Sequence, residues 1–162
     1  MKNADALPDL GPTLGFLALL WELNHSLEVR SSHMRSALGV TSQQRAILRI
    51  VGKFPRLSAG ELSRLLRLDA GTVSATLTRL EDRGLVTRTR DSRDRRRVEL
   101  GLTAAGRRLD VPAECSVEHV VAGVLASRPA AEREAACAFL SALAAAFEAQ
   151  PNPAPQKEQS RP

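Results

Sequence analysis

Arginine is concentrated in one stretch near the middle of the chain. Between Arg79 and Arg97 there are eight arginines and four acidic residues, which leaves a net charge of +4. The arginines occupy positions 79, 83, 88, 90, 93, 95, 96 and 97. A guanidinium group presents several donors in one plane, which suits it to phosphate oxygens and to base edges. Because basic runs are also common on plain solvated surfaces, the chemistry depends on the elements that carry these arginines.

A helix is predicted immediately before and within this basic stretch. Asp69 is expected to cap its first turn, and Gly84 is expected to end it in a left-handed conformation. One face carries Val73, Leu77 and Leu80 at helical spacing. The opposite face has no large apolar side chain and consists of Gly71, Thr72, Ala75, Thr78, Arg79 and Asp82. A helix with such a face can enter a DNA groove without a bulky side chain in the way.

Two short strands joined by a basic loop are predicted after the helix. Residues 85–90 read as the first strand, and residues 98–102 as the second, because apolar residues alternate there. The segment between them, residues 91–97, contains Asp-Ser and Arg-Asp pairs that favour a turn. A polar-faced helix followed by a basic hairpin suits a groove-binding helix and a loop that reaches phosphates or the minor groove. We therefore predict binding to double-stranded DNA.

The candidate DNA contacts lie on three segments. On the helix and the first strand they are Ala70, Thr72, Ser74, Ala75, Thr78, Arg79 and Arg88. In the basic loop they are Arg93, Asp94, Arg95, Arg96 and Arg97. On an earlier helix, which in such motifs crosses the DNA backbone, they are Ser42, Gln43 and Arg45. For this last group a plain surface is an equally good interpretation.

Four motifs, in this order and spacing, resemble the multiple-antibiotic-resistance-regulator (MarR) family of winged helix-turn-helix repressors. The motifs are LDAGTV at 68–73, LEDRGLV at 80–86 with Arg88, DSRDRR at 91–96 and LTAAG at 102–106. The resemblance spans roughly residues 10–149, and its recognition stretch is most similar to the organic-hydroperoxide-sensing branch. It implies a homodimer on a pseudo-palindromic operator. It also implies a small phenolic or otherwise apolar effector bound between the dimer layer and the DNA-binding lobe.

The resemblance also implies roles within the basic loop, which would be the wing. In relatives with an Asp-x-Arg pattern, the arginine at the wing tip enters the minor groove and the aspartate steadies its guanidinium. The matching residues here are Arg96 and Asp94. A narrow minor groove concentrates negative potential and attracts arginine, which agrees with this assignment. The flanking arginines are expected to meet phosphates.

The chain is expected to divide into terminal segments, a DNA-binding domain and a dimerisation region. Residues 1–8 are expected to be flexible, and residues 150–162, rich in proline, glutamine and charge, to be disordered. Residues 41–102 form the predicted winged helix-turn-helix domain. Residues 9–40 and 103–149 form the helical dimerisation region. The expected fold is mainly α with a small β-hairpin wing, a dimeric winged helix-turn-helix protein with six helices.

The first and last helices are more apolar than a single small chain can bury. The first is apolar on more than one face, so a second subunit is its simplest burial partner. The candidate dimer contacts are Leu14, Leu17, Leu20, Trp21, Phe139, Leu140, Leu143 and Phe147. Pro112 is a departure from the family pattern, because proline in a helix interior removes a hydrogen bond. We predict a kink or break at residues 110–113.

Length and composition agree with one small basic domain. The chain has 162 residues, of which 43% are hydrophobic and 3% aromatic, so an aliphatic core is expected. A net charge of +5 favours a polyanionic partner. The longest apolar stretch, residues 14–21, is too short to span a bilayer. We expect no signal peptide, no membrane partner and a cytoplasmic location.

Alternative functions are less well supported by the sequence than DNA binding. Cys115 and Cys137 leave open a thiol-based oxidant sensor of the same fold, although hydroperoxide-sensing relatives keep their reactive cysteine near the first helix. A winged-helix module that binds protein is a second alternative. His25, His33 and His119 lack the spacing of metal ligands, and we expect no metal or cofactor. An enzyme is disfavoured because the chain has no glycine-rich phosphate loop, nucleophile elbow or HExxH motif.

Overall fold

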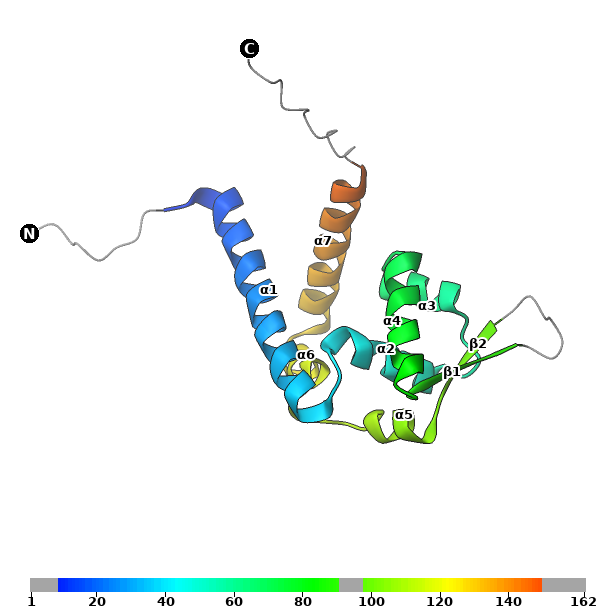
Figure 1. Ribbon diagram of the computed structural model, residues 1–162. Helices are drawn as coiled ribbons and strands as arrows, with labels where there is room; N and C mark the ends of the chain where they lie inside the picture. Colours follow the sequence, from blue (N-terminus) through cyan, green and yellow to red (C-terminus); the bar gives the residue numbers. More distant parts are fainter. Residues whose placement is uncertain (1–8, 91–97, 150–162) are drawn as a thin grey trace, which may run out of the picture. The chain divides into compact units, whose positions relative to one another are not determined.

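The computed structural model describes residues 9–90 and 98–149, which form seven helices and one two-stranded sheet (Figure 1). In chain order these elements are α1 (Gly11–Leu38), α2 (Ser42–Lys53), α3 (Ala59–Leu66), α4 (Ala70–Asp82), β1 (Val86–Arg90), β2 (Val98–Leu102), α5 (Ala104–Leu109), α6 (Val117–Ala126) and α7 (Ala130–Ala149). The chain divides into two units, one up to Val120 and one from Val121 onward. Each unit is described by itself.

The core of the first unit lies among α2, α3, α4 and the hairpin. Its fully or nearly buried apolar side chains are Val40, Ile47, Leu48, Val51, Leu62, Val73, Leu77, Leu80, Leu85, Val86 and Leu100. Burying one such side chain stabilises a fold by about 1.5–3 kcal/mol relative to leaving it in water. The apolar face predicted for α4 is therefore the face that packs, and its packing fixes which face is exposed.

Side-chain caps define where the helices of this unit begin. Thr41 and Ser58 each form a capping box, in which the side chain three residues later bonds back to the cap amide. The Asp69 carboxylate accepts a hydrogen bond of 2.7 Å from the Thr72 amide at the start of α4. Gly84 follows α4 with a φ of 64°, the left-handed conformation expected of it. The predicted start and the predicted end of α4 are confirmed.

The predicted hairpin is also confirmed on both sides of the basic loop. Strands β1 and β2 pair antiparallel, with Val86 opposite Leu102 and Arg90 opposite Val98. The Leu100 amide donates to the Leu57 carbonyl at 2.8 Å, which ties the sheet to the turn between α2 and α3. The hairpin is thereby joined to the helices by backbone bonds as well as by its buried residues.

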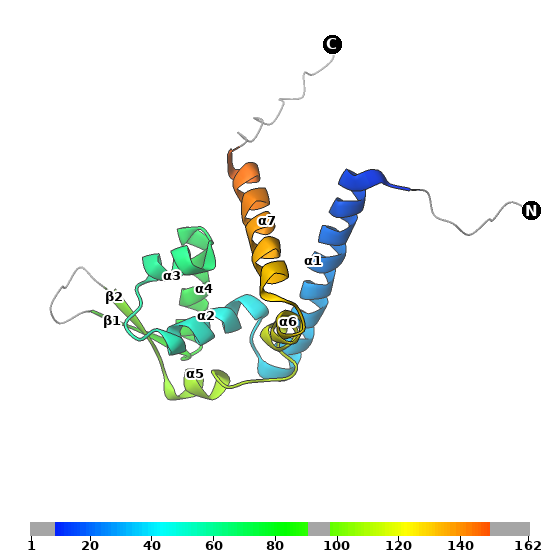
Figure 2. The same ribbon diagram turned by 180° about the vertical axis from the view of Figure 1, so that it is seen from behind.

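The predicted interruption at Pro112 is a complete break. Helix α5 ends at Leu109 and α6 does not begin until Val117, with irregular chain between them (Figure 2). Proline has no amide hydrogen and its ring clashes with the preceding turn, so a continuous helix cannot pass through it. The described residues consequently form seven helices, where six were expected.

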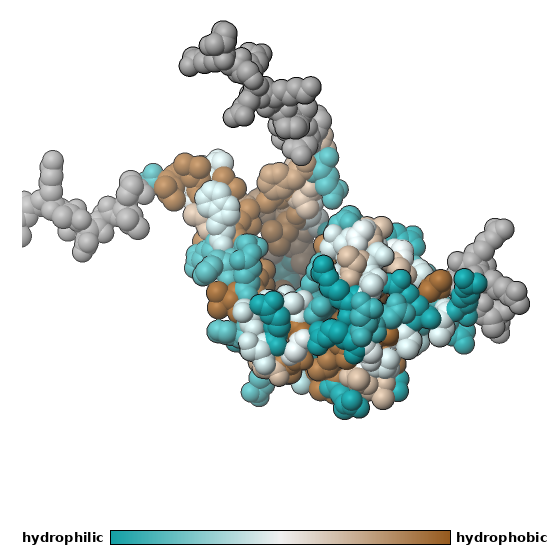
Figure 3. All heavy atoms as spheres, viewed as in Figure 1, coloured by the Kyte–Doolittle hydropathy of each residue, from teal (hydrophilic) through white to brown (hydrophobic). Residues whose placement is uncertain are grey.

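Helix α1 exposes much of its apolar surface in the single chain. Leu14 is 55% exposed and Trp21 is 66% exposed, while Leu17 and Leu20 are half-buried. Within α1 only Met34 is buried. Figure 3 shows this apolar surface along α1. Within one chain the apolar faces of α1 are thus left largely exposed, and their burial by a second subunit stays a prediction.

Helix α7 in the second unit is similarly exposed. Phe139, Leu140 and Phe147 are 54%, 49% and 64% exposed, and Leu143 is half-buried. Neither α6 nor α7 contains a buried residue. None of the helices in the described part of the chain combines the length and the apolar character needed to cross a membrane.

Candidate nucleic-acid interface

Helix α4 presents a face of small and polar side chains to solvent. Burial of Val73, Leu77 and Leu80 turns the opposite side of the helix outward. The outward candidates are Ala70, Ser74, Ala75, Thr78 and Arg79, which are exposed, and Thr72, which is half-buried. A face without bulky apolar residues allows the helix backbone to approach base edges closely, so that hydroxyl and guanidinium groups can reach them.

The first turn of α4 is held by Asp69. Hydrogen bonds from the Thr72 side chain and from the Thr72 amide lower the pKa of the Asp69 carboxyl below its ordinary value. The carboxylate is therefore the form that the helix start favours. This cap fixes the end of the helix that carries Ala70 and Thr72.

Arg88 on β1 bonds to α4 and does not point freely into solvent. Its Nη2 lies 3.3 Å from the Thr78 hydroxyl and 3.5 Å from the Ser74 carbonyl oxygen. Its Nε lies 3.3 Å from a carboxylate oxygen of Glu81. The Thr78 hydroxyl donates in turn to the Ser74 carbonyl at 3.0 Å. The structure thus brings three predicted contacts, Ser74, Thr78 and Arg88, into one cluster.

Glu81 belongs to this cluster and sequence reasoning did not single it out. Its side chain is 42% exposed and that of Arg88 is 31% exposed, so the ion pair is partly screened by water. Its position three residues after Thr78 places it on the same helix face. This spacing was the available signal, but only the register of β1 beside α4 shows that Arg88 is the partner.

The candidates on α2 lie in different surroundings. Gln43 is exposed, and Ser42 is half-buried with its amide and its hydroxyl each 3.0 Å from the Ser31 hydroxyl. Arg45 is only 1% exposed, so the interpretation of Arg45 as a phosphate contact is wrong. Its guanidinium points inward because it bonds to groups far along the chain.

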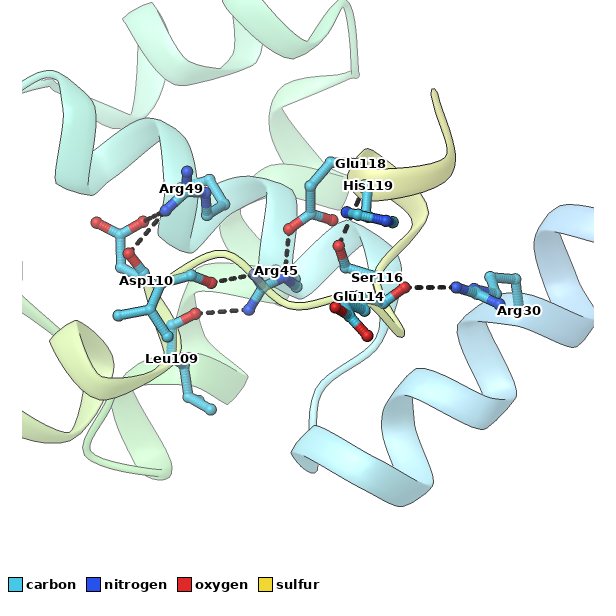
Figure 4. Close-up of polar contacts among 10 residues, drawn as sticks. Arg30, Arg45, Arg49, Leu109, Asp110, Glu114, Ser116, Glu118 and His119 are labelled. Atoms are coloured by element: carbon cyan, nitrogen blue, oxygen red, sulfur yellow. Dashed lines mark hydrogen bonds and ion pairs between the residues drawn. The ribbon is translucent and has the colours of Figure 1, made fainter. Parts of the chain in front are cut away.

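Arg45 sits at the centre of a polar cluster shown in Figure 4. It donates to the carbonyl oxygens of Leu109 and Val111, at 2.6 Å each, and pairs with the carboxylate of Glu118. Arg49, one turn further along α2, donates to both the carbonyl oxygen and the carboxylate of Asp110 at 2.7 Å. These bonds hold the irregular chain around Pro112 against α2.

Sequence reasoning missed this role because arginine on a helix is normally exposed. One signal was present: Arg45 lies three residues before Leu48 and seven before Gly52, on the buried side of α2. At Gly52 an added Cβ would lie 1.9 Å from a carboxylate oxygen of Asp110. A glycine on that face therefore indicates that another segment approaches closely.

The loop candidates Arg93, Asp94, Arg95, Arg96 and Arg97 lie outside the described residues. Among the residues that are described, no group of three His, Cys, Asp or Glu side chains could hold a metal ion. A hollow of about 310 Å³ lies between α1 and the start of α2. Residues that line it include Leu27, Ser31, Arg35 and Ser42.

A short helix, a tight turn, a polar-faced second helix and an antiparallel hairpin together define a winged helix-turn-helix protein. The MarR family model matches residues 38–97. An HTH-type transcriptional repressor of Mycobacterium tuberculosis (strain H37Rv) is 34% identical over 113 residues, which cover 70% of this chain and 80% of the relative. This chain therefore belongs to the MarR family, and it is a DNA-binding transcriptional regulator.

Solved structures agree with this fold. The PcaV transcriptional regulator from Streptomyces coelicolor, solved with its natural ligand, has a TM-score of 0.63 and 27% identity, covering 88% of this chain and 99% of that one. FabT of Streptococcus pneumoniae in complex with DNA has a TM-score of 0.61 and 23% identity, covering 84% of this chain and 96% of that one. The FabT likeness is one of fold alone.

Proposed function

We propose that this chain is a ligand-responsive transcriptional repressor that binds a pseudo-palindromic operator as a homodimer in the cytoplasm. The observation that carries the proposal is the exposed polar face of α4, held at one end by the Asp69 cap and along its side by Arg88. The repressor function is supported by the name of the mycobacterial relative. In this assignment residues 41–102 read DNA, and residues 9–40 and 103–149 form the dimer.

The homodimer is supported by the apolar surface that the single chain leaves in water. Trp21 on α1 and Phe147 on α7 are each about two-thirds exposed, at 66% and 64%. Large exposed apolar side chains on a helix are typical of a surface that a partner covers. The dimer contacts in this proposal are Leu14, Leu17, Leu20, Trp21, Phe139, Leu140, Leu143 and Phe147.

A two-fold symmetric dimer presents two copies of α4 to DNA. Recognition helices of such dimers enter major grooves about 34–36 Å apart, one helical turn of B-DNA. The exposed α4 residues would then contact base edges and phosphates of each half-site. The wings would reach the adjacent minor grooves through Arg96, with Arg93, Arg95 and Arg97 near phosphates.

A small apolar or phenolic effector is the proposed regulatory ligand. The hollow between α1 and the start of α2 supports this part of the proposal, since it adjoins both the dimerisation helix and the DNA-binding helices. Its volume of about 310 Å³ is that of a small-molecule site, and its lining, in which Leu27 is the one apolar residue, favours an effector that carries a polar group such as a phenolic hydroxyl. The PcaV structure contains a natural ligand, which supports a ligand site in a protein of similar fold.

Gel retardation and footprinting on the intergenic DNA beside the gene test the proposal. We expect a protected site with two inverted half-sites, and a variant with Thr78→Val and Arg79→Ala should lose most of the protection. A variant of exposed Glu22→Gln on α1 serves as the control, because it alters charge away from α4. A winged-helix module that binds protein would retard no DNA specifically, and that result would overturn the proposal.

A further inference from the structure

Arg45 bonds to the chain on both sides of the break at Pro112. Before the proline, its two terminal nitrogens donate to the carbonyl oxygens of Leu109 and Val111 at 2.6 Å. After the proline, its Nε pairs with the carboxylate of Glu118, in the first turn of α6. In Figure 4 the guanidinium lies between these groups. One side chain thus connects the end of α5 to the beginning of α6.

Neighbouring arginines each hold one side of the break. Arg49 bonds to the carbonyl and carboxylate oxygens of Asp110, before Pro112. Arg30 on α1 donates to the carbonyl oxygen of Glu114, after Pro112, at 2.6 Å. These bonds fasten the two sides to different helices. The bonds of Arg45 fasten them to each other.

The surroundings of Arg45 make its geometry specific. Arg45 is only 1% exposed, so water cannot solvate its positive charge. The carboxylate and the two carbonyl oxygens must supply the hydrogen bonds in place of water. A guanidinium can donate in several fixed directions within one plane, whereas a lysine ammonium lies at the end of a flexible stem. Lysine at this position would not reach all of these acceptors together.

In an unbroken helix, backbone hydrogen bonds would fix the direction of α6 relative to α5. Here α5 ends at Leu109 and α6 begins at Val117, so no helical ladder spans the interval. The side-chain bonds of Arg45 replace the ladder as the link between the DNA-binding lobe and the start of α6. Glu118 belongs to residues 103–149, which the proposed function assigns to the dimer, so the bonds of Arg45 join the DNA-binding domain to the beginning of that region.

We propose that Arg45 is a positioning residue for operator binding, because its bonds to Leu109, Val111 and Glu118 set the half-site spacing that the dimer accepts. The inference rests on the proposed homodimer. In a symmetric dimer the distance and rotation between two recognition helices follow from how each lobe is attached. A stiff attachment rejects operators whose half-sites are moved, and a loose one tolerates them.

The experiment measures half-site spacing directly. The parent protein selects duplexes from a random-sequence pool, and the selected operator is remade with its spacer changed by one and by two base pairs. A single half-site duplex is included. A change of two base pairs rotates one half-site by about 70°. We expect this change to weaken the parent about tenfold or more.

Two variants loosen the link in different ways. Arg45→Lys removes the planar fork, and Glu118→Gln keeps the side-chain shape but removes the charge on the α6 side. Both variants should bind the single half-site with an affinity within about twofold of the parent's. For both, changing the spacer by two base pairs should weaken binding by less than about threefold. Arg49→Lys is the matched control: it changes an arginine of the same helix that bonds only before Pro112, and it should keep the parent's spacing preference.

Each other outcome overturns the inference. If Glu118→Gln and Arg45→Lys keep the parent's spacer penalty, the link does not set spacing. If they lose as much affinity for the single half-site as for the operator, the effect is general damage to the lobe. If Arg45→Lys does not fold, Glu118→Gln decides alone. If Arg49→Lys also lost the dependence of affinity on spacer length, the effect would not be specific to the bonds across the break. A parent that selects no paired half-sites would instead overturn the proposed homodimeric function.

Discussion

The guanidinium of Arg88 lies 3.3 Å from the hydroxyl of Thr78, and so joins the base of the wing to the recognition helix. The Thr78 hydroxyl donates to the Ser74 carbonyl, which leaves its lone pairs directed toward Arg88. The orientation of a candidate base contact is thus determined by a residue on the neighbouring strand. Strand β1 and helix α4 should therefore act as one unit when they meet DNA.

A double-mutant cycle tests this unit. Arg88→Ala and Thr78→Val should each weaken operator binding, and their effects should deviate from additivity by at least about 0.5 kcal/mol, because the two side chains bond to each other. Operator titrations at one fixed salt concentration measure the affinities. The pair Arg88→Ala with Gln43→Ala is the control and should be additive. Additive effects for Arg88 and Thr78 would show that their contact does not matter for binding.

The second prediction concerns the wing tip. Arg96→Ala should weaken operator binding by about 1–3 kcal/mol and by more than Arg93→Ala does, because an arginine in the minor groove contributes more than a phosphate contact. Asp94→Ala should also weaken binding, although it removes a negative charge. Fixed-salt titrations compare the three variants. Equal or tighter binding by Asp94→Ala would mean that the wing is only a basic patch.

Gly106 is the subject of the third prediction. A Cβ at this position would lie 2.1 Å from the Leu85 carbonyl oxygen, a backbone atom that cannot move aside easily. Gly106→Ala should therefore lower the free energy of unfolding by about 1–3 kcal/mol, as measured by urea denaturation. Gly60→Ala is the matched control, since nothing lies within 4 Å of its added Cβ. Equal stability of the two variants would contradict the close approach at Gly106.

The fourth prediction is a pH dependence of stability at the start of α4. Bonds from the Thr72 side chain and amide lower the pKa of Asp69 in the folded chain. Its contribution should be fully present above the ordinary carboxyl pKa and should be lost as pH falls through the lowered value. The free energy of unfolding of the parent and of Asp69→Asn, compared from neutral to acid pH, isolates the contribution of the Asp69 carboxylate. If the free energies of unfolding of the parent and of the variant changed with pH in parallel, the prediction would be contradicted.

The last prediction concerns the two free thiols. Cys115 is half-buried and Cys137 is exposed. We expect mild peroxide to leave operator binding unchanged, and the variant Cys115→Ser with Cys137→Ser to bind like the parent. Retardation assays with and without oxidant measure this. Loss of binding on oxidation, rescued by the double substitution, would favour an oxidant-sensing regulator.

Local signals carried most of the fold prediction. The caps at Thr41, Ser58 and Asp69 and the glycine after α4 act within a few residues, so the sequence shows them directly. The break at Pro112 was predictable for the same reason. The partners of Arg45 lie 64, 66 and 73 residues away, and no local pattern reports them. That distance is why a buried arginine was interpreted as a surface contact.

The broken helix also affects how this protein can diverge. A continuous helix is maintained by many equivalent backbone bonds, and exchanging one exposed side chain hardly alters its direction. Here the direction of α6 relative to α5 depends on a few side chains, above all Arg45 and Glu118. If these bonds set the half-site spacing, a single substitution at either position changes which operators the dimer accepts while the residues of α4 stay the same. Half-site spacing and base recognition are then separately adjustable in one small chain.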